Sequence, residues 1–281
     1  MYRKADLSIL EPYLSFEPLE WADIVRFGDD VLAMAEAPNA IECFRYLQAD
    51  LQHSPGKPLA LWSTKDCFSP ERCNALLRIL GDRHKQYAGR NVLPSPLSGC
   101  TMAREENVFC GLIRWLRCVR RPVIMIFQGK VSLSFLGIGL ACDYRIAVSD
   151  TTFHNQGRDL DMPPGAGLLY LLPAYVGLGR VNSLVTRSTE TSAQSALEYG
   201  LLDEVVASSE LEPSLRAMAA DVSHFSSETL DTIKQLLNTR LPDFDNYCTM
   251  ETQGLDRALR GKPWEKLAAD DAGAGEIRPS E

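Results

Sequence analysis

The chain has 281 residues, of which 45% are hydrophobic, and a formal net charge of −8 at pH 7. This length and apolar content allow a large buried core, which favours a globular protein of one domain or one domain with an appendage. The acidic balance argues against a general nucleic-acid surface, because such surfaces need clustered lysine and arginine to replace the counterions along phosphates. A local basic patch for a single phosphate group remains compatible with the composition.

The basic residues at the start of the chain are followed by no apolar run, and no stretch of 18 or more apolar residues occurs. We therefore expect neither a signal peptide nor a membrane partner, and a cytoplasmic location. The eight cysteines form no CxxC pair and fall mostly in apolar segments, which favours reduced thiols over disulfides. The scattered histidines lack metal-ligand spacing, so no metal site is expected.

The first part of the chain alternates between strand and helix patterns. Residues 31–35 form a short apolar run that predicts a strand, and apolar residues recur at helical spacing after Pro38. Residues 59–62 predict a second strand, and residues 74–80 a second helix. Residues 81–105 are polar and show no periodicity, so this segment is expected to be a long loop.

The central segment has the clearest pattern. An apolar face predicts a helix over 108–119, and strand patterns follow at 123–127 and 144–148, on either side of the glycine-rich segment 129–142. Because strands alternate with helices, parallel pairing through right-handed crossovers is expected. This layout is typical of an α/β fold.

Helical patterns dominate from about residue 210 onward. They cover 215–222, 227–237 and 245–259. We therefore divide the chain into an α/β core (1–209), a C-terminal helical subdomain (210–265) that would serve oligomerisation, and a tail (266–281). The tail is small, acidic and glycine-rich, a composition that favours disorder.

Three sequence blocks carry a family resemblance. They are RPVIMIFQGKVSLSFLGIGLACDYRIAVSD at 121–150, PPGAGLLYLLPAYVGLGRVNS at 163–183 and SALEYGLLDEVVA at 195–207. In order and spacing they resemble the enoyl-CoA hydratase/isomerase (crotonase) family, and the resemblance extends over about 30–207. It implies a crotonase-like α/β spiral of repeated ββα units with a C-terminal helical subdomain. It also implies a homo-oligomer, a trimer or a hexamer.

The resemblance implies binding of an acyl thioester of coenzyme A or of acyl carrier protein, with its carbonyl oxygen between two backbone N–H groups. The substrate itself carries coenzyme A or phosphopantetheine, so no separate cofactor is expected. Such an oxyanion hole can supply about 3 to 4 kcal/mol per donor. By family spacing the donors belong to Arg72 and Ser134. The family usually has small residues where this chain has Glu71, Arg72, Ser134 and Phe135. The side chain of Phe135 or Arg72 could therefore partly fill the thioester site.

The two acids of a standard hydratase are missing. Hydration needs a base to activate water and an acid to protonate the α-carbon. Gly137 and Gly157 stand where the family resemblance places these two glutamates. Asp159 and Asp161 are the nearest surviving acids, and His154 is a third candidate. Each also has a structural interpretation, as a solvent-facing or capping carboxylate or as a strand-end histidine.

Two classes of function therefore remain open. The first is an enzyme that forms an enolate of an acyl thioester by chemistry other than hydration. Decarboxylation suits it best, because loss of CO₂ generates the enolate without a base, and isomerisation with Asp159 or Asp161 as the proton shuttle comes next. The second class is a non-catalytic homologue that binds thioesters or a partner protein.

Overall fold

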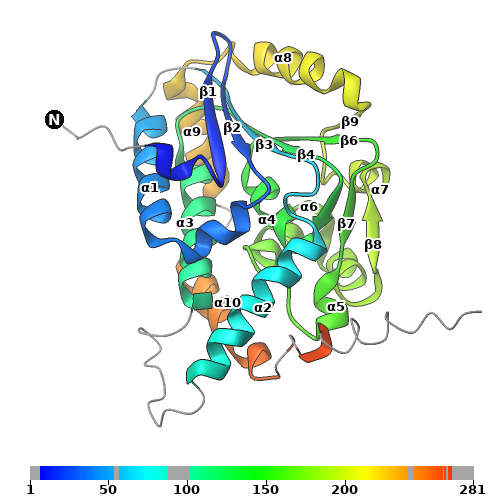
Figure 1. The fold of residues 1–281 in the computed structure, drawn as a ribbon. Helices are drawn as coiled ribbons and strands as arrows, with labels where there is room; N and C mark the ends of the chain where they lie inside the picture. The colour runs from blue at the N-terminus through cyan, green and yellow to red at the C-terminus, as the bar shows by residue number, and fades with distance from the viewer. Residues whose placement is uncertain are drawn as a thin grey trace, which may run out of the picture.

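The computed structural model describes residues 7–53, 57–87, 101–239, 243–261, 263 and 265–267. Within this part of the chain a six-stranded sheet has the order β1-β2-β3-β4-β6-β9, and a second, three-stranded sheet has the order β5-β7-β8. Helices cover both faces of the larger sheet (Figure 1). The smaller sheet stands beside it and leads into the site described below.

The strands are β1 (Leu14–Pro18), β2 (Asp23–Phe27), β3 (Leu59–Ser63), β4 (Val123–Phe127), β5 (Lys130–Ser132), β6 (Tyr144–Val148), β7 (Thr152–His154), β8 (Glu190–Ser192) and β9 (Glu204–Val206). From β2 through β3, β4 and β6 to β9 the pairing is parallel, as expected. β1 pairs antiparallel with β2, and β8 pairs antiparallel with β7. β5 and β7 are parallel.

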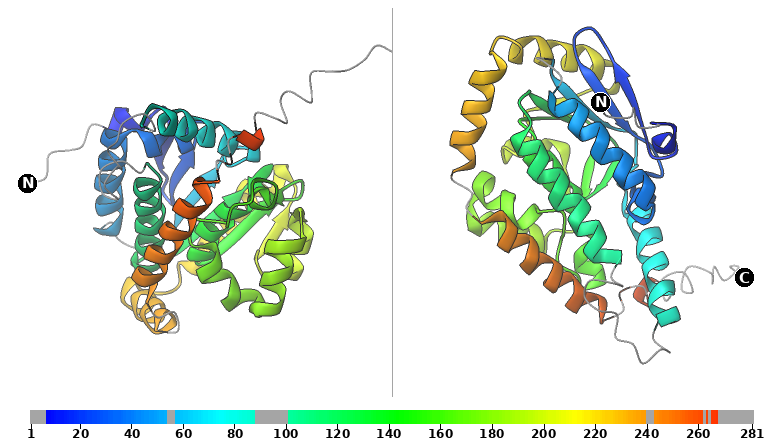
Figure 2. Two further views of the ribbon diagram at one scale, coloured as in Figure 1. Left: turned by 90° about the horizontal axis from the view of Figure 1, so that it is seen from below. Right: turned by 90° about the vertical axis from the view of Figure 1, so that its left-hand side faces the viewer.

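The α-helices are α1 (Pro38–His53), α2 (Pro70–Tyr87), α3 (Thr101–Cys118), α4 (Leu133–Ala141), α5 (Gln156–Leu160), α6 (Leu168–Asn182), α7 (Ala193–Glu198), α8 (Leu211–Val222), α9 (Ser227–Asn238) and α10 (Phe244–Leu259). The shorter helical segments are η1 (Leu7–Leu10), η2 (Val31–Glu36), η3 (Ser183–Arg187) and η4 (Ser208–Glu210). The expected C-terminal helices are thus present as α8, α9 and α10. Figure 2 shows α9 and α10 running beside α3.

The core lies on both faces of the larger sheet. All five residues of β4 are buried, as the continuous apolar run of a parallel strand requires when both its faces are covered. On one face, residues of α1, α3 and α4 pack against the sheet. On the other face, α8 covers the strands with its residues Leu211, Leu215, Met218 and Ala219.

Two predictions from the sequence were wrong. Residues 31–35 form the 3₁₀-helix η2, and β2 is the strand that pairs with β3. Val31, Leu32 and Met34 reach the core from η2, because a short apolar run can be buried in either conformation. The loop expected at 81–105 is also too long, since α2 continues to Tyr87 and α3 begins at Thr101. Residues 88–100 and the tail from 268 lie outside the described residues.

One segment in the described part of the chain, Leu168–Arg187, is long and apolar enough to cross a membrane by length and composition alone. It is not one straight helix, because Gly177 has a left-handed φ of 71° and interrupts α6. Leu168, Leu171 and Leu172 at its start are buried in the core. We therefore interpret the segment as a core helix with an exposed second half.

Candidate active site

A cavity of about 130 Å³ lies between the starts of α2 and α4, α5, the turn before α6, and α10. It is lined by Cys73, Leu76, Leu77, Phe109, Ser132, Ser134, Phe135, Gln156, Gly157, Leu160, Met162, Pro163, Gly165, Ala166 and Leu255. Most of this lining is apolar, and the polar side chains are two hydroxyls, one amide and one thiol. Such a composition is typical of a small-molecule pocket, where a few polar groups orient an apolar ligand.

The second oxyanion segment borders this cavity. Ser134 is the second residue of α4, and the first N–H groups of a helix have no acceptor within the helix. The dipole of α4 adds partial positive charge at this end. The Ser134 Oγ accepts a hydrogen bond from the Gly165 N–H at 3.2 Å, which joins α4 to the turn before α6. Ser134 thus has both a fixed position and a backbone donor beside the cavity.

The first oxyanion segment is held next to the second, because the Ser132 N–H donates to the Phe68 carbonyl at 2.7 Å. Here Pro70 begins α2, and the Arg72 N–H approaches the Ser69 Oγ at 3.4 Å. The Arg72 guanidinium instead binds the Asp29 carboxylate at 2.8 Å. The Arg72 side chain is therefore not part of the cavity wall.

Phe135 does occupy part of the cavity wall. Its ring stacks on Phe68 with the ring centroids 4.6 Å apart and meets Phe109 edge-on at 5.5 Å.

Cys73, one residue after Arg72, contributes a thiol to the cavity lining, and burial raises the pKa of this thiol to about 12. A thiol with such a pKa is neutral at pH 7 and is not an activated nucleophile. The cysteines of the described residues are all free thiols, as expected from the sequence.

Glycine is required by packing at both positions where the resemblance places the hydratase acids. A Cβ on Gly137 would lie 2.2 Å from the Ala166 carbonyl oxygen and 2.8 Å from the Leu168 nitrogen. A Cβ on Gly157 would lie 2.4 Å from the Met162 carbonyl oxygen. These neighbours are backbone atoms, which cannot move aside as a flexible side chain can. In this structure neither position has room for a glutamate.

The candidate acids from the sequence lie outside the cavity lining. Asp159 is exposed on α5. Asp161 follows α5 in a left-handed conformation, and its side chain is 93% exposed, with Lys266 at 3.9 Å. The His154 ring lies between the Thr152 hydroxyl at 2.8 Å and the Glu190 carboxylate at 3.3 Å. The structure does not bring the three candidates together, and their role in proton transfer stays a prediction.

Sequence reasoning missed the buried carboxylate of Glu251 on α10. It accepts hydrogen bonds from the Gly167 N–H at 3.1 Å and from the Tyr247 hydroxyl at 2.6 Å. Burial raises the pKa of Glu251, and these two hydrogen bonds oppose the rise. Its one sequence signal was the spacing of Tyr247, Glu251 and Leu255 on one helix face.

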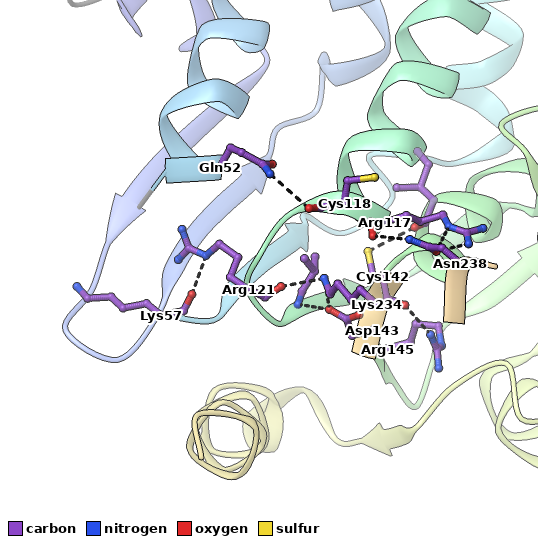
Figure 3. Close-up of polar contacts among 12 residues, drawn as sticks. Gln52, Lys57, Arg117, Cys118, Arg121, Cys142, Asp143, Arg145, Lys234 and Asn238 are labelled. Carbon is purple, nitrogen blue, oxygen red and sulfur yellow. Dashed lines mark hydrogen bonds and ion pairs between the residues drawn. The ribbon is translucent and has the colours of Figure 1, made fainter. Parts of the chain in front are cut away.

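A second polar cluster fixes α9 on the core, as Figure 3 shows. The Lys234 ammonium binds the Asp143 carboxylate at 2.7 Å and the Arg121 carbonyl at 2.9 Å. Burial raises the pKa of Asp143 despite this pairing. The cluster borders a largely apolar cavity of about 310 Å³. Because these groups bind one another, we interpret the cluster as structural.

Among the described residues, no group of three or more His, Cys, Asp or Glu side chains lies close enough together to hold a metal ion.

A family model described as "Enoyl-CoA hydratase/isomerase" matches residues 103–255, which is more than half of the chain. The protein therefore belongs to the enoyl-CoA hydratase/isomerase family. Two curated relatives illustrate the range of similar proteins. A probable enoyl-CoA hydratase of Mycobacterium tuberculosis is 29% identical over 153 residues, covering 54% of each chain. A trans-2-decenoyl-[acyl-carrier-protein] isomerase of Streptococcus mutans is 28% identical over 122 residues, covering 43% of this chain and 46% of that one.

The chain thus aligns with only about half the length of these curated relatives. Solved structures match nearly all of it. An enoyl-CoA hydratase from Bacillus halodurans has a TM-score of 0.72 at 16% identity and covers 92% of this chain and 99% of its own. A methylmalonyl-CoA decarboxylase with 2-nitronate-propionyl-CoA has a TM-score of 0.69 at 18% identity, covering 92% and 96%. At these identities the likeness establishes the crotonase-like α/β fold.

Proposed function

We propose that this protein binds an acyl thioester, of coenzyme A or acyl carrier protein, and stabilises its enolate with the backbone N–H groups of Arg72 and Ser134. The observation that carries the proposal is an apolar cavity bordered by the N-terminal turns of α2 and α4. The Arg72 N–H approaches Ser69 at a distance that is long for a hydrogen bond, so a negatively charged oxygen can compete for it.

We further propose decarboxylation or double-bond isomerisation in preference to hydration. In decarboxylation the bond between the α-carbon and the carboxylate breaks, CO₂ leaves, and the electron pair remains as the enolate, which then takes up one proton. No general base is required for that step. Support comes from the packing at Gly137 and Gly157, which leaves no room for the hydratase acids. For isomerisation, Asp159 or Asp161 would have to move to the cavity.

Hydration is the competing reaction, since many of the similar proteins have hydratase names. The decisive experiment incubates the purified protein with malonyl-type, methylmalonyl-type and enoyl thioesters. CO₂ release, double-bond migration and 3-hydroxyacyl formation are measured in parallel. Release of CO₂ or migration of the double bond without hydration would support the proposal. Hydration as the fastest reaction would contradict it.

The second candidate function is a non-catalytic homologue that binds thioesters or a partner protein. The observation that favours it is that Asp159, Asp161 and His154 all lie outside the cavity lining, while the bulky Phe135 forms part of it. Calorimetry with coenzyme A and butyryl-CoA separates the two classes when combined with the turnover assay. Binding of thioesters without turnover of any substrate would favour this candidate.

We also propose a homo-oligomer, a trimer or a hexamer. Its support is a set of exposed apolar side chains at the end of α6 and on and before α9, among them Leu178, Phe225, Leu236 and Leu237. Apolar exposure of this kind often marks an interface. Light scattering after size-exclusion chromatography measures the mass, and a monomer at micromolar concentration would contradict the proposal. The cytoplasmic location and the absence of a resident cofactor stay predictions.

A further inference from the structure

A buried hydrogen-bonded contact joins α10 to the turn at the cavity. The two carboxylate oxygens of Glu251 lie 3.1 Å and 3.4 Å from the Gly167 nitrogen. The Tyr247 hydroxyl donates to the same carboxylate from one turn earlier on α10. Glu251 is only 9% exposed, although burying a carboxylate is unfavourable without such partners. Because burying this carboxylate costs free energy, its presence here calls for a specific structural or functional explanation.

Gly167 is the last residue of the turn that shapes one side of the cavity. Its φ of +67° is left-handed, and a Cβ there would lie 2.5 Å from the Ile113 side chain. The two residues before it, Gly165 and Ala166, line the cavity. The N–H group that binds Glu251 also lies at the start of α6, where the helix dipole favours a carboxylate. Glu251 therefore holds this turn in place.

The same contact positions a cavity wall on α10 itself. Leu255 lies one turn after Glu251 and lines the cavity. A Cβ on Gly165 would be 3.3 Å from the Leu255 side chain, so α10 and the turn are in direct proximity here as well. Glu251 and Leu255 thus act on the same short turn, one through a hydrogen bond and the other through packing.

We propose that Glu251 is a positioning residue that fixes the turn 165–167 and α10 around the acyl part of the ligand, and so sets thioester affinity. The inference rests on the proposed function for its ligand. Glu251 itself does not line the cavity, so it acts through Gly165, Ala166 and Leu255.

The test compares Glu251→Met with Glu251→Gln in the full-length protein. The two side chains are similar in size, but only glutamine keeps an acceptor for the Gly167 N–H. We expect Glu251→Met to accelerate hydrogen exchange in the peptide covering 165–170 at least tenfold and to raise the Kd for butyryl-CoA about tenfold. Glu251→Gln should change each by less than threefold. Tyr247→Phe keeps the Gly167 contact and should give an intermediate rise in Kd.

For a substrate that turns over, Glu251→Met should raise KM while kcat stays within about threefold. A double-mutant cycle of Glu251→Met with Leu255→Ala should be non-additive in Kd, because both residues act on one turn. An unchanged Kd in Glu251→Met would overturn the inference, and so would equal losses in the Met and Gln variants. If Glu251→Met does not fold, a Tyr247→Phe variant with the parent Kd would overturn it.

Failure of the proposed function is distinguishable from failure of this inference. Hydrogen exchange is measured on the protein without ligand, so it tests the contact between Glu251 and the turn independently of any thioester. A parent protein that binds no thioester would refute the proposed function, and with it the affinity part of the inference. A parent that binds butyryl-CoA, together with a Glu251→Met variant that exchanges and binds as the parent does, would refute the inference alone.

Discussion

Replacing Ser134 with proline removes one backbone N–H from the cavity. Ser134 is the second residue of α4, a first-turn position where proline is tolerated because its N–H has no acceptor within the helix. Proline also removes the hydroxyl that accepts the Gly165 N–H at 3.2 Å. Ser134→Ala removes that hydroxyl and keeps the N–H, so it is the matched control.

The two variants should differ strongly in rate and little in stability. Losing one oxyanion donor costs about 2.7–4 kcal/mol of transition-state stabilisation, or roughly 10²–10³ in kcat. Losing the hydrogen bond to Gly165 costs about 0.5–1.5 kcal/mol in stability. We therefore expect Ser134→Pro to lose at least 100-fold in kcat relative to Ser134→Ala, on whichever thioester the parent protein turns over.

The assay is steady-state turnover, with urea unfolding of both variants to measure how much folded protein is present. A proline variant that is folded and retains kcat within threefold of the alanine variant would refute the role of this N–H. Equal, large losses in both variants would assign the effect to the hydroxyl and its contact with Gly165 instead.

Two further predictions concern stability. Gly137→Ala should lower the free energy of unfolding by about 3 kcal/mol or more in urea titrations, because its Cβ would lie 2.2 Å from the Ala166 carbonyl oxygen; Gly111→Ala, on α3 with open space around it, is the control and should be neutral or stabilising. The second prediction concerns the pH dependence of Glu251→Gln. As pH rises from about 4.5 through the raised pKa of Glu251, the parent protein should lose stability relative to this variant, because folded Glu251 keeps a proton that the unfolded chain has already lost. Glutamine does not titrate, so the stability of the variant lacks this pH dependence. The loss should be roughly 1.4 kcal/mol for each unit by which the folded pKa exceeds the unfolded one, and a pH-independent difference would contradict this.

Local periodicity in the sequence was enough to predict three strands of the larger sheet, β3, β4 and β6, and six helices, α1, α2, α3, α8, α9 and α10. The run at 123–127 is apolar throughout and became the fully buried β4, while the apolar faces at 108–119 and 245–259 became parts of α3 and α10. Such patterns predict secondary structure because apolar residues at helix or strand spacing lie on one face of the element, and that face is buried. The family blocks at 121–150 and 163–183 likewise identified two of the segments that line the cavity.

Tertiary packing decided the features that depend on residues far apart in sequence. Residues 31–35 lie in η2, and β2 takes the sheet position beside β3. Gly137 is constrained by the backbone at Ala166 and Leu168, and Glu251 by Gly167, 84 positions away. No local pattern reports such contacts, since they arise only when separate elements pack together. The sequence therefore identified two of the segments that build the site, and the fold determined which other elements join them and which side chains face the cavity.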